Sequence, residues 1–92
     1  MVGTLLLHLL LPGCVSLKEK RSRLKPFLHR LHREFNLSVA ETDLQDHWQE
    51  AIVLCAMAGN GRAYLESALE TVSRWSRLHW EGEILEAKIE IL

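Results

Sequence analysis

The chain has 92 residues, 48% hydrophobic and 25% charged, which is the composition of a folded globular protein and not of a disordered segment. Its 11 Lys and Arg residues are offset by 12 Asp and Glu residues, so the net charge of −1 counts against a uniformly basic nucleic-acid-binding protein. The two cysteines, Cys14 and Cys55, form no C-x-x-C motif and indicate no disulfide framework. We therefore expect a single domain over residues 1–92, in a reducing cytoplasmic compartment, with no metal or other cofactor.

The first apolar segment, residues 2–11 (VGTLLLHLLL), is predicted to be a strand that is apolar on both faces and is broken by Pro12 and Gly13. A secretory signal is the alternative for this segment. However, no Lys or Arg precedes the run, His8 interrupts it, and about 10 residues are too few to span a bilayer. We therefore expect a strand, with no signal and no contact with a membrane.

Residues 17–35 are predicted to form a helix, around which the rest of the chain is organised. Ser16 and Glu19 make the S-x-x-E capping pattern at its start, and Asn36 is expected to end it in a left-handed conformation. Pro26 should bend this helix without ending it, because the apolar stripe continues beyond it. The stripe recurs at helical spacing and comprises Leu17, Leu24, Leu28, Leu31 and Phe35.

The same helix carries most of the positive charge. It holds seven of the 11 basic residues against two Glu residues, whereas the other ten of the 12 acidic residues follow it. Two interpretations stay open: a solvated face that balances acidic strands, or a surface that binds RNA or another anion. The seven basic residues are Lys18, Lys20, Arg21, Arg23, Lys25, Arg30 and Arg33.

The remaining chain alternates between strand and helix patterns. Strands are predicted over residues 37–43, 49–58 and 83–92, and a second helix over residues 62–78. Asn60 is a candidate cap for that helix. The order β-α-β-β-α-β is the ferredoxin-like α+β pattern, with two helices on one face of a four-stranded antiparallel sheet. In that topology the first and third strands are central, which agrees with their apolar residues on both faces.

Two further surfaces are candidates for binding. The sheet face away from the helices should expose an apolar strip, which predicts a homodimer or another protein partner unless polar neighbours such as His8 make it tolerable in a monomer. Near the second hairpin, four carboxylates could bind a cation or a basic partner, or could simply be solvated: Glu41, Asp43, Asp46 and Glu50. His29 and His32 lie three residues apart, but no third metal ligand is evident.

Two segments are specific enough to suggest a family. PGCVSLKEKRSRLK and FNLSVAETDLQDHWQEAIVLCAMAGN resemble the YlxP-like family of small bacterial proteins, a domain of unknown function. The resemblance implies a ferredoxin-like fold. It also implies a link to ribosome maturation or translation, because such genes tend to lie beside that of ribosome-binding factor A, but it implies no biochemical activity. Besides Leu17, Lys18, Lys20 and Arg21, the matching positions are Ser16, Glu19, Glu41, Asp43, Gln45, Asp46, Trp48 and Gln49.

Three functions follow from these patterns. The first is binding of RNA or a ribosome-assembly particle. The basic helix is the expected contact, since the sheet lacks the aromatic residues of the RNA-recognition motif. The second is a non-catalytic protein-interaction module that uses the open sheet face or the acidic hairpin. The third is a phosphate site at the start of the first helix, as in acylphosphatases, but the loop lacks their glycine-rich, arginine-bearing pattern. No catalytic residue is predicted, and Trp48 is expected to cap the core.

Overall fold

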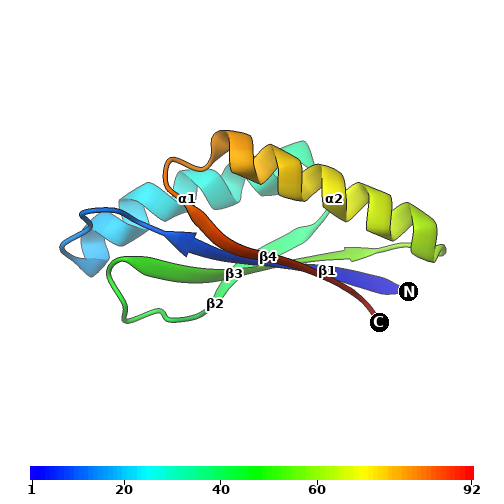
Figure 1. Ribbon diagram of the computed structural model, residues 1–92, viewed down its shortest axis with the longest axis horizontal. Coiled ribbons are helices and arrows are strands. Elements are labelled where there is room, and N and C mark those ends of the chain that lie inside the picture. Colours follow the sequence, from blue (N-terminus) through cyan, green and yellow to red (C-terminus); the bar gives the residue numbers. More distant parts are fainter.

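The computed structural model describes residues 1–92 and has two layers, a sheet and a pair of helices that cover one of its faces (Figure 1). The elements in order are β1 (Val2–Leu10), α1 (Leu17–Glu34), β2 (Ser38–Asp43), β3 (Glu50–Ala58), α2 (Arg62–His79) and β4 (Ile84–Ile91). This order confirms the predicted ferredoxin-like α+β fold. No helix is both long enough and apolar enough to cross a membrane.

The sheet has the strand order β2-β3-β1-β4, and every neighbouring pair is antiparallel. The two strands that are apolar on both faces are therefore central, as predicted. β1 and β3 pair along their whole length, from Val2 opposite Ala58 to Leu10 opposite Glu50. The segment considered as a possible secretory signal thus forms a central strand of the sheet.

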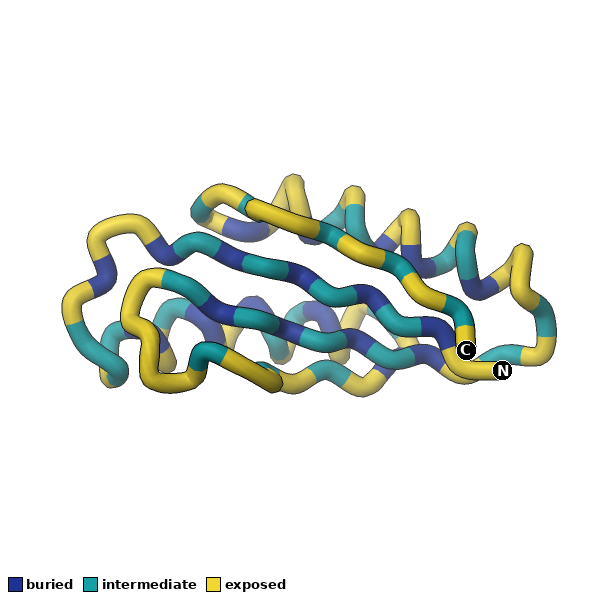
Figure 2. The backbone as a smooth tube through the Cα atoms, turned by 60° about the horizontal axis from the view of Figure 1, so that its bottom comes forward, coloured by how far each residue is buried: buried dark blue, intermediate teal, exposed yellow.

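The core lies between the sheet and the helices. Alternate residues of β1 and β3 point into it, and the residues between them are only half-buried, which Figure 2 shows as a dark and light alternation along both strands. A strand alternates its side chains between two faces, so this pattern means that one face is covered and the other is open. The buried set includes Leu5, Leu7, Leu9, Val53, Cys55, Leu24, Leu31, Leu65, Leu69 and Val72.

Several predicted boundaries move by one residue, and two capping predictions are wrong. α1 ends at Glu34, and Phe35 follows it in an extended conformation, so Asn36 does not end the helix in left-handed geometry. The residue before α2 is Gly61 and not Asn60, and no side chain caps that helix. The one non-glycine residue with positive φ is Leu44, at 58°, in the turn after β2. α1 runs through Pro26, whose side chain is exposed.

Candidate nucleic-acid interface

The start of α1 is fixed by one half of the predicted capping box. The amide of Glu19 donates to Ser16 Oγ at 3.0 Å, which satisfies an otherwise unpaired donor of the first turn. The Glu19 carboxylate does not reach back to the helix start. It accepts instead from Arg23, one turn further along, at 3.1 Å.

Lys20 lies inside the protein, with a side chain only 2% exposed. Its Nζ is 2.7 Å from Glu41 Oε2 on β2 and donates to the carbonyl oxygen of Leu44 at 2.8 Å. The Lys20 ammonium is also the sole partner of this buried Glu41 oxygen. Lys20 is therefore removed from the set of side chains that could contact a ligand, because its side chain is buried and its charge is already paired.

Arg23 is held by three acceptors of the protein itself. Its Nε donates to Glu81 at 2.6 Å, and its Nη1 donates to Glu19 and to the carbonyl oxygen of Pro12 at 2.9 Å. The hydrogen bond that Arg23 donates to Glu81 is the main cause that raises the pKa of Arg23. This guanidinium links the β1–α1 loop, α1 and the segment before β4, and it has few donors left for an external phosphate.

Arg30 lies on the same side of α1 as Arg23 and contacts α2. Its guanidinium carbon is 5.3 Å from the centroid of the Trp75 ring, within the range of a cation–π interaction. Trp75 is in turn stacked on Phe27 and on His79, at centroid distances of 5.9 and 4.3 Å. Arg30 is thus half-buried against an aromatic cluster between the helices and is only partly available to a ligand.

The other four predicted cations are exposed and form no ion pair within the protein: Lys18, Arg21, Lys25 and Arg33. At 100° per residue they share one side of α1 with His29 and His32. The two carboxylates of the helix, Glu19 and Glu34, fall on the opposite side with Arg23. We call the side formed by Lys18, Arg21, Lys25, His29, His32 and Arg33 the cationic face.

The cationic face borders the edge strand β2. A shallow depression between α1 and β2 is lined by Leu28, His29, His32, Ser38 and Val39. The ring of His32 lies 2.9 Å from the carbonyl oxygen of Leu37, which orients this histidine at the end of the helix. β2 is an edge strand, so no further strand flanks the cationic face on this side.

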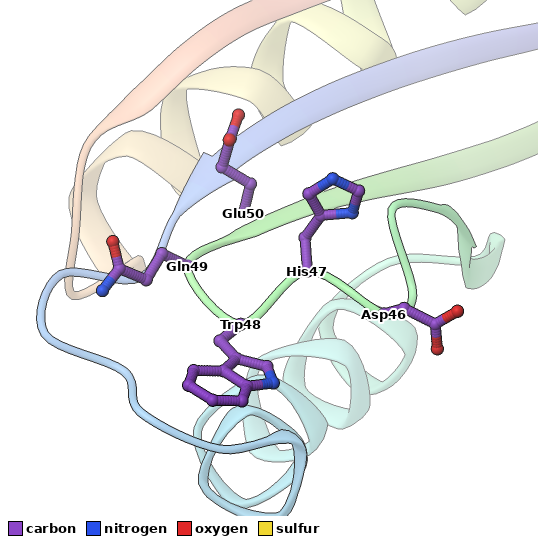
Figure 3. A pocket seen from close by; sticks show the side chains of 5 residues that line it. All are labelled: Asp46, His47, Trp48, Gln49 and Glu50. Atoms are coloured by element: carbon purple, nitrogen blue, oxygen red, sulfur yellow. The ribbon is translucent and has the colours of Figure 1, made fainter.

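The loop between β2 and β3, residues 44–49, lies at the same end of the molecule as the start of α1. Besides the Lys20 contact at Leu44, Gln49 Nε2 donates to the carbonyl oxygen of Cys14 at 3.3 Å, and Gln49 accepts from the amide of Leu11 at 2.7 Å. An open depression of about 310 Å³ is lined by Asp46, His47, Trp48, Gln49 and Glu50 (Figure 3). Trp48 is 51% exposed, so the prediction that it caps the core is wrong.

The acidic residues of this hairpin do not converge. Glu41 is paired with Lys20, Asp43 Oδ1 accepts from the amide of Leu44, and Glu50 lies 2.7 Å from the ring of His8 on the open sheet face. Asp46 is exposed and makes no hydrogen bond within the protein. No group of three or more His, Cys, Asp or Glu side chains is arranged to hold a metal ion. The arrangement therefore favours separate structural roles over a cation site.

The candidate phosphate site at the start of α1 keeps few of its donors. Of the three cations in the first turns of the helix, Lys20 is buried and paired, and only Lys18 and Arg21 are exposed. Arg23, which contacts the β1–α1 loop, spends its Nη1 donor on Pro12 and Glu19. The geometry gives this loop no free guanidinium of its own.

Comparison with known proteins decides the family. Residues 2–89 match the family described as "Protein of unknown function (DUF503)". The chain belongs to this family. It is also 40% identical over 57 residues to "Uncharacterized protein YlxP" of Bacillus subtilis (strain 168). That match spans 62% of the chain and 62% of the relative, and it confirms the YlxP-like resemblance seen in the motifs. Neither description names an activity.

Half of the twelve family-motif positions pair with another group at this end of the protein. Ser16, Glu19, Glu41, Asp43 and Gln49 each pair with a group of the protein, as does Lys20. Gln45, Asp46 and Trp48 are exposed and make no hydrogen bond within the protein. The burial of Lys20 was missed although the sequence carries its signal: it precedes Leu24 by four residues and Phe27 by seven, and so falls on the apolar side of the helix.

Proposed function

We propose that this protein is a non-catalytic RNA-binding protein that contacts RNA, free or within a ribosome-assembly particle, through the cationic face of α1. The observation that carries the proposal is that Lys18, Arg21, Lys25 and Arg33 are all exposed, lie on one side of the helix, and have no carboxylate partner in the protein. Unpaired basic groups on one face attract a polyanion even when the total charge is near zero. Such a partner would be met in the cytoplasm.

The chemistry of this face suits the RNA backbone. From Lys18 to Arg33 the helix rises about 22 Å, a span over which several successive phosphates can be neutralised. Arginine presents a planar fork of donors that matches a phosphate group, and two of the four cations are arginines. The open sheet face offers Leu6, Leu54 and other aliphatic groups and no Phe, Tyr or Trp ring, so bases are not expected to stack there as they do on an RNA-recognition motif.

An RNA-binding assay over a salt series tests this function. The wild-type protein should bind, and its affinity should fall steeply as the salt concentration rises, because binding releases counterions from the phosphates. The double variant Arg21→Glu, Lys25→Glu should lose binding. The matched control is Arg62→Glu, Arg74→Glu, which makes the same charge change on exposed residues of α2 and should bind like the wild type apart from a small long-range charge effect. Equal losses in both variants would contradict a specific role for α1.

A partner on the open sheet face is the second candidate, and one observation favours it. Leu6, Leu10, Ile52 and Leu54 form a half-buried apolar strip on the two central strands, bordered by Glu86, Lys88 and Glu90 of β4. A protein-interaction module would bury this strip against a second copy or another protein. Sedimentation of the wild type and of Leu54→Glu separates the cases, since a dimer through this face would dissociate in the variant and RNA binding by α1 would persist.

A pull-down from cell lysate with and without ribonuclease tests whether the protein binds a ribosomal particle through its RNA. If the cationic face binds RNA, ribosomal particles should co-purify with the wild type and should be lost after ribonuclease treatment. Capture that survives both ribonuclease and the Arg21→Glu, Lys25→Glu change would favour the protein-interaction module instead.

A further inference from the structure

The β2–β3 loop is fastened at both ends beside the first turns of α1. At its start, the Leu44 carbonyl accepts from Lys20 Nζ at 2.8 Å, and at its end Gln49 bonds to Cys14 and to Leu11. Lys20 stands between Lys18 and Arg21 in the helix, so the loop is anchored at the helical turn that carries these two exposed cations. A side chain of this loop is therefore held beside the first turns of α1, where the cationic face begins.

Trp48 is the side chain that the loop presents. In Figure 3 its ring points from the loop toward the first turns of α1, whereas His47 points to the other side. It is 51% exposed, makes no hydrogen bond and stacks on no other ring. The other two tryptophans are satisfied by the protein: Trp75 is packed between Phe27 and His79, and Trp80 is 6% exposed with its Nε1 donating to Leu10. Trp48 alone offers a free indole surface.

The residues that line the depression beside Trp48 disfavour a phosphate inside it. The depression beside it is lined by the carboxylates of Asp46 and Glu50, which repel a phosphate at close range. A carboxylate oxygen can instead accept from the exocyclic amino group of a base, as acidic side chains do with cytosine. One oxygen of Glu50 is already paired with His8, and the Asp46 carboxylate, which makes no hydrogen bond within the protein, points away from the Trp48 ring in Figure 3. The phosphates would then lie outside the depression, on Lys18 and Arg21.

We propose that Trp48 stacks on an unpaired base of single-stranded RNA whose backbone lies along the cationic face. This inference rests on the proposed function and names its substrate class, because a base inside a duplex has no free face to offer. An indole ring beside a row of cations is the combination that binds single strands without strong sequence preference. The proposal makes the β2–β3 loop, and not the sheet, the base-contacting element of this fold.

Two RNA probes and two variants test the proposal. The probes are fluorescein-labelled single-stranded RNA of about ten nucleotides and a duplex of the same length. Trp48→Ala should weaken binding of the single strand by roughly tenfold or more and leave duplex binding unchanged, since the cations remain. Trp48→Phe keeps a stacking ring and should bind the single strand within a few-fold of the wild type. The intrinsic tryptophan fluorescence of the wild type should be quenched by the single strand, and that of Trp48→Phe should not.

The outcomes separate this proposal from the function on which it rests. If the wild type binds RNA and Trp48→Ala binds the single strand equally well, base stacking is overturned and the cationic face stands. If Trp48→Ala weakens the single strand and the duplex to the same degree, the ring does not discriminate bases and the proposal also fails. If the wild type binds neither probe at low salt, both proposals fail, and a protein partner becomes the better interpretation of the exposed indole.

Discussion

Lys20 and Glu41 form the one buried ion pair of the protein and join α1 to β2, with Nζ and Oε2 2.7 Å apart and the lysine side chain 2% exposed. A buried charge is tolerated only when it is paired, because removing it from water costs several kcal/mol. The same ammonium also satisfies the Leu44 carbonyl at the one non-glycine residue with positive φ. The pair therefore fixes both the edge strand and the loop that follows it.

Breaking this pair should destabilise the fold. We expect Glu41→Gln to lower the free energy of unfolding by about 2–4 kcal/mol, since it leaves the buried lysine charge without its partner. The double variant Lys20→Met, Glu41→Gln should recover part of that loss, which urea denaturation of the four proteins in the cycle would measure. As a control, Glu90→Gln in the exposed Lys88–Glu90 pair should change stability by less than about 1 kcal/mol. Equal losses at both pairs would contradict the burial argument.

Arg21 and Arg23 are two residues apart but should respond oppositely to the same substitution. Arg23→Gln should lower stability by about 1–3 kcal/mol, because it breaks bonds to Glu81, Glu19 and Pro12, and should leave RNA affinity nearly unchanged. Arg21→Gln should leave the thermal midpoint unchanged and weaken RNA binding. Thermal unfolding and RNA titration of both variants test the pair. A loss of RNA affinity in Arg23→Gln, at a temperature where the variant is folded, would show that Arg23 contributes to RNA binding.

Cys55 should make stability fall in alkaline solution. Burial raises the pKa of its thiol from 9.0 to about 12. Between those values the unfolded chain loses this proton and the native protein keeps it, so the native state binds more protons and its stability decreases as pH rises from about 9 to 12. The slope attributable to Cys55 is at most about 1.4 kcal/mol per pH unit. Comparing the urea midpoints of wild type and Cys55→Ala across this range isolates it, and parallel curves would contradict the prediction.

Gly82 should not tolerate a side chain. A Cβ atom at this position would lie 2.3 Å from the carbonyl oxygen of Leu10 and 2.9 Å from Pro12, and the first of these is backbone that cannot move aside cheaply. We expect Gly82→Ala to cost about 1–3 kcal/mol, seen as a lower thermal midpoint. Gly61→Ser is the matched comparison, because nothing lies within 4 Å of its Cβ and α2 has no side-chain cap. That variant should be neutral or stabilising by up to about 1 kcal/mol.

Much of the fold could be predicted from local patterns. The alternation of Leu5, Leu7 and Leu9 with half-buried neighbours identifies a central strand, and the spacing of Leu24 and Leu31 identifies the buried side of α1. Such patterns survive folding because each element buries its apolar side whatever lies opposite. The capping predictions at Asn36 and Asn60 failed because the end of α1 and the start of α2 depend on how the chain connects to the neighbouring element. Phe35 and Gly61 take the extended conformations at these two positions.

The cationic face could be predicted only in part. Periodicity alone placed Lys18, Arg21, Lys25 and Arg33 on one side of the helix, and the structure shows their side chains exposed. The position of Trp48 could not be obtained in this way. A loop has no regular spacing of apolar residues. The exposure of Trp48 depends on two contacts that hold its loop in place, from Lys20 to Leu44 and from Gln49 to Cys14.

By itself, the amino-acid sequence determined the order of strands and helices, the central pair of strands, and the presence of a strongly basic helix, because these depend on residue type and spacing along one element. Only the tertiary structure decided which of those basic residues remain free. Lys20, Arg21 and Arg23 point in three directions from one helix, and each meets a different environment: a buried carboxylate on β2, solvent, and the carboxylate of Glu81 just before β4. The residue type sets the charge of a side chain, but whether that charge is available to a partner depends on the groups that the fold places beside it.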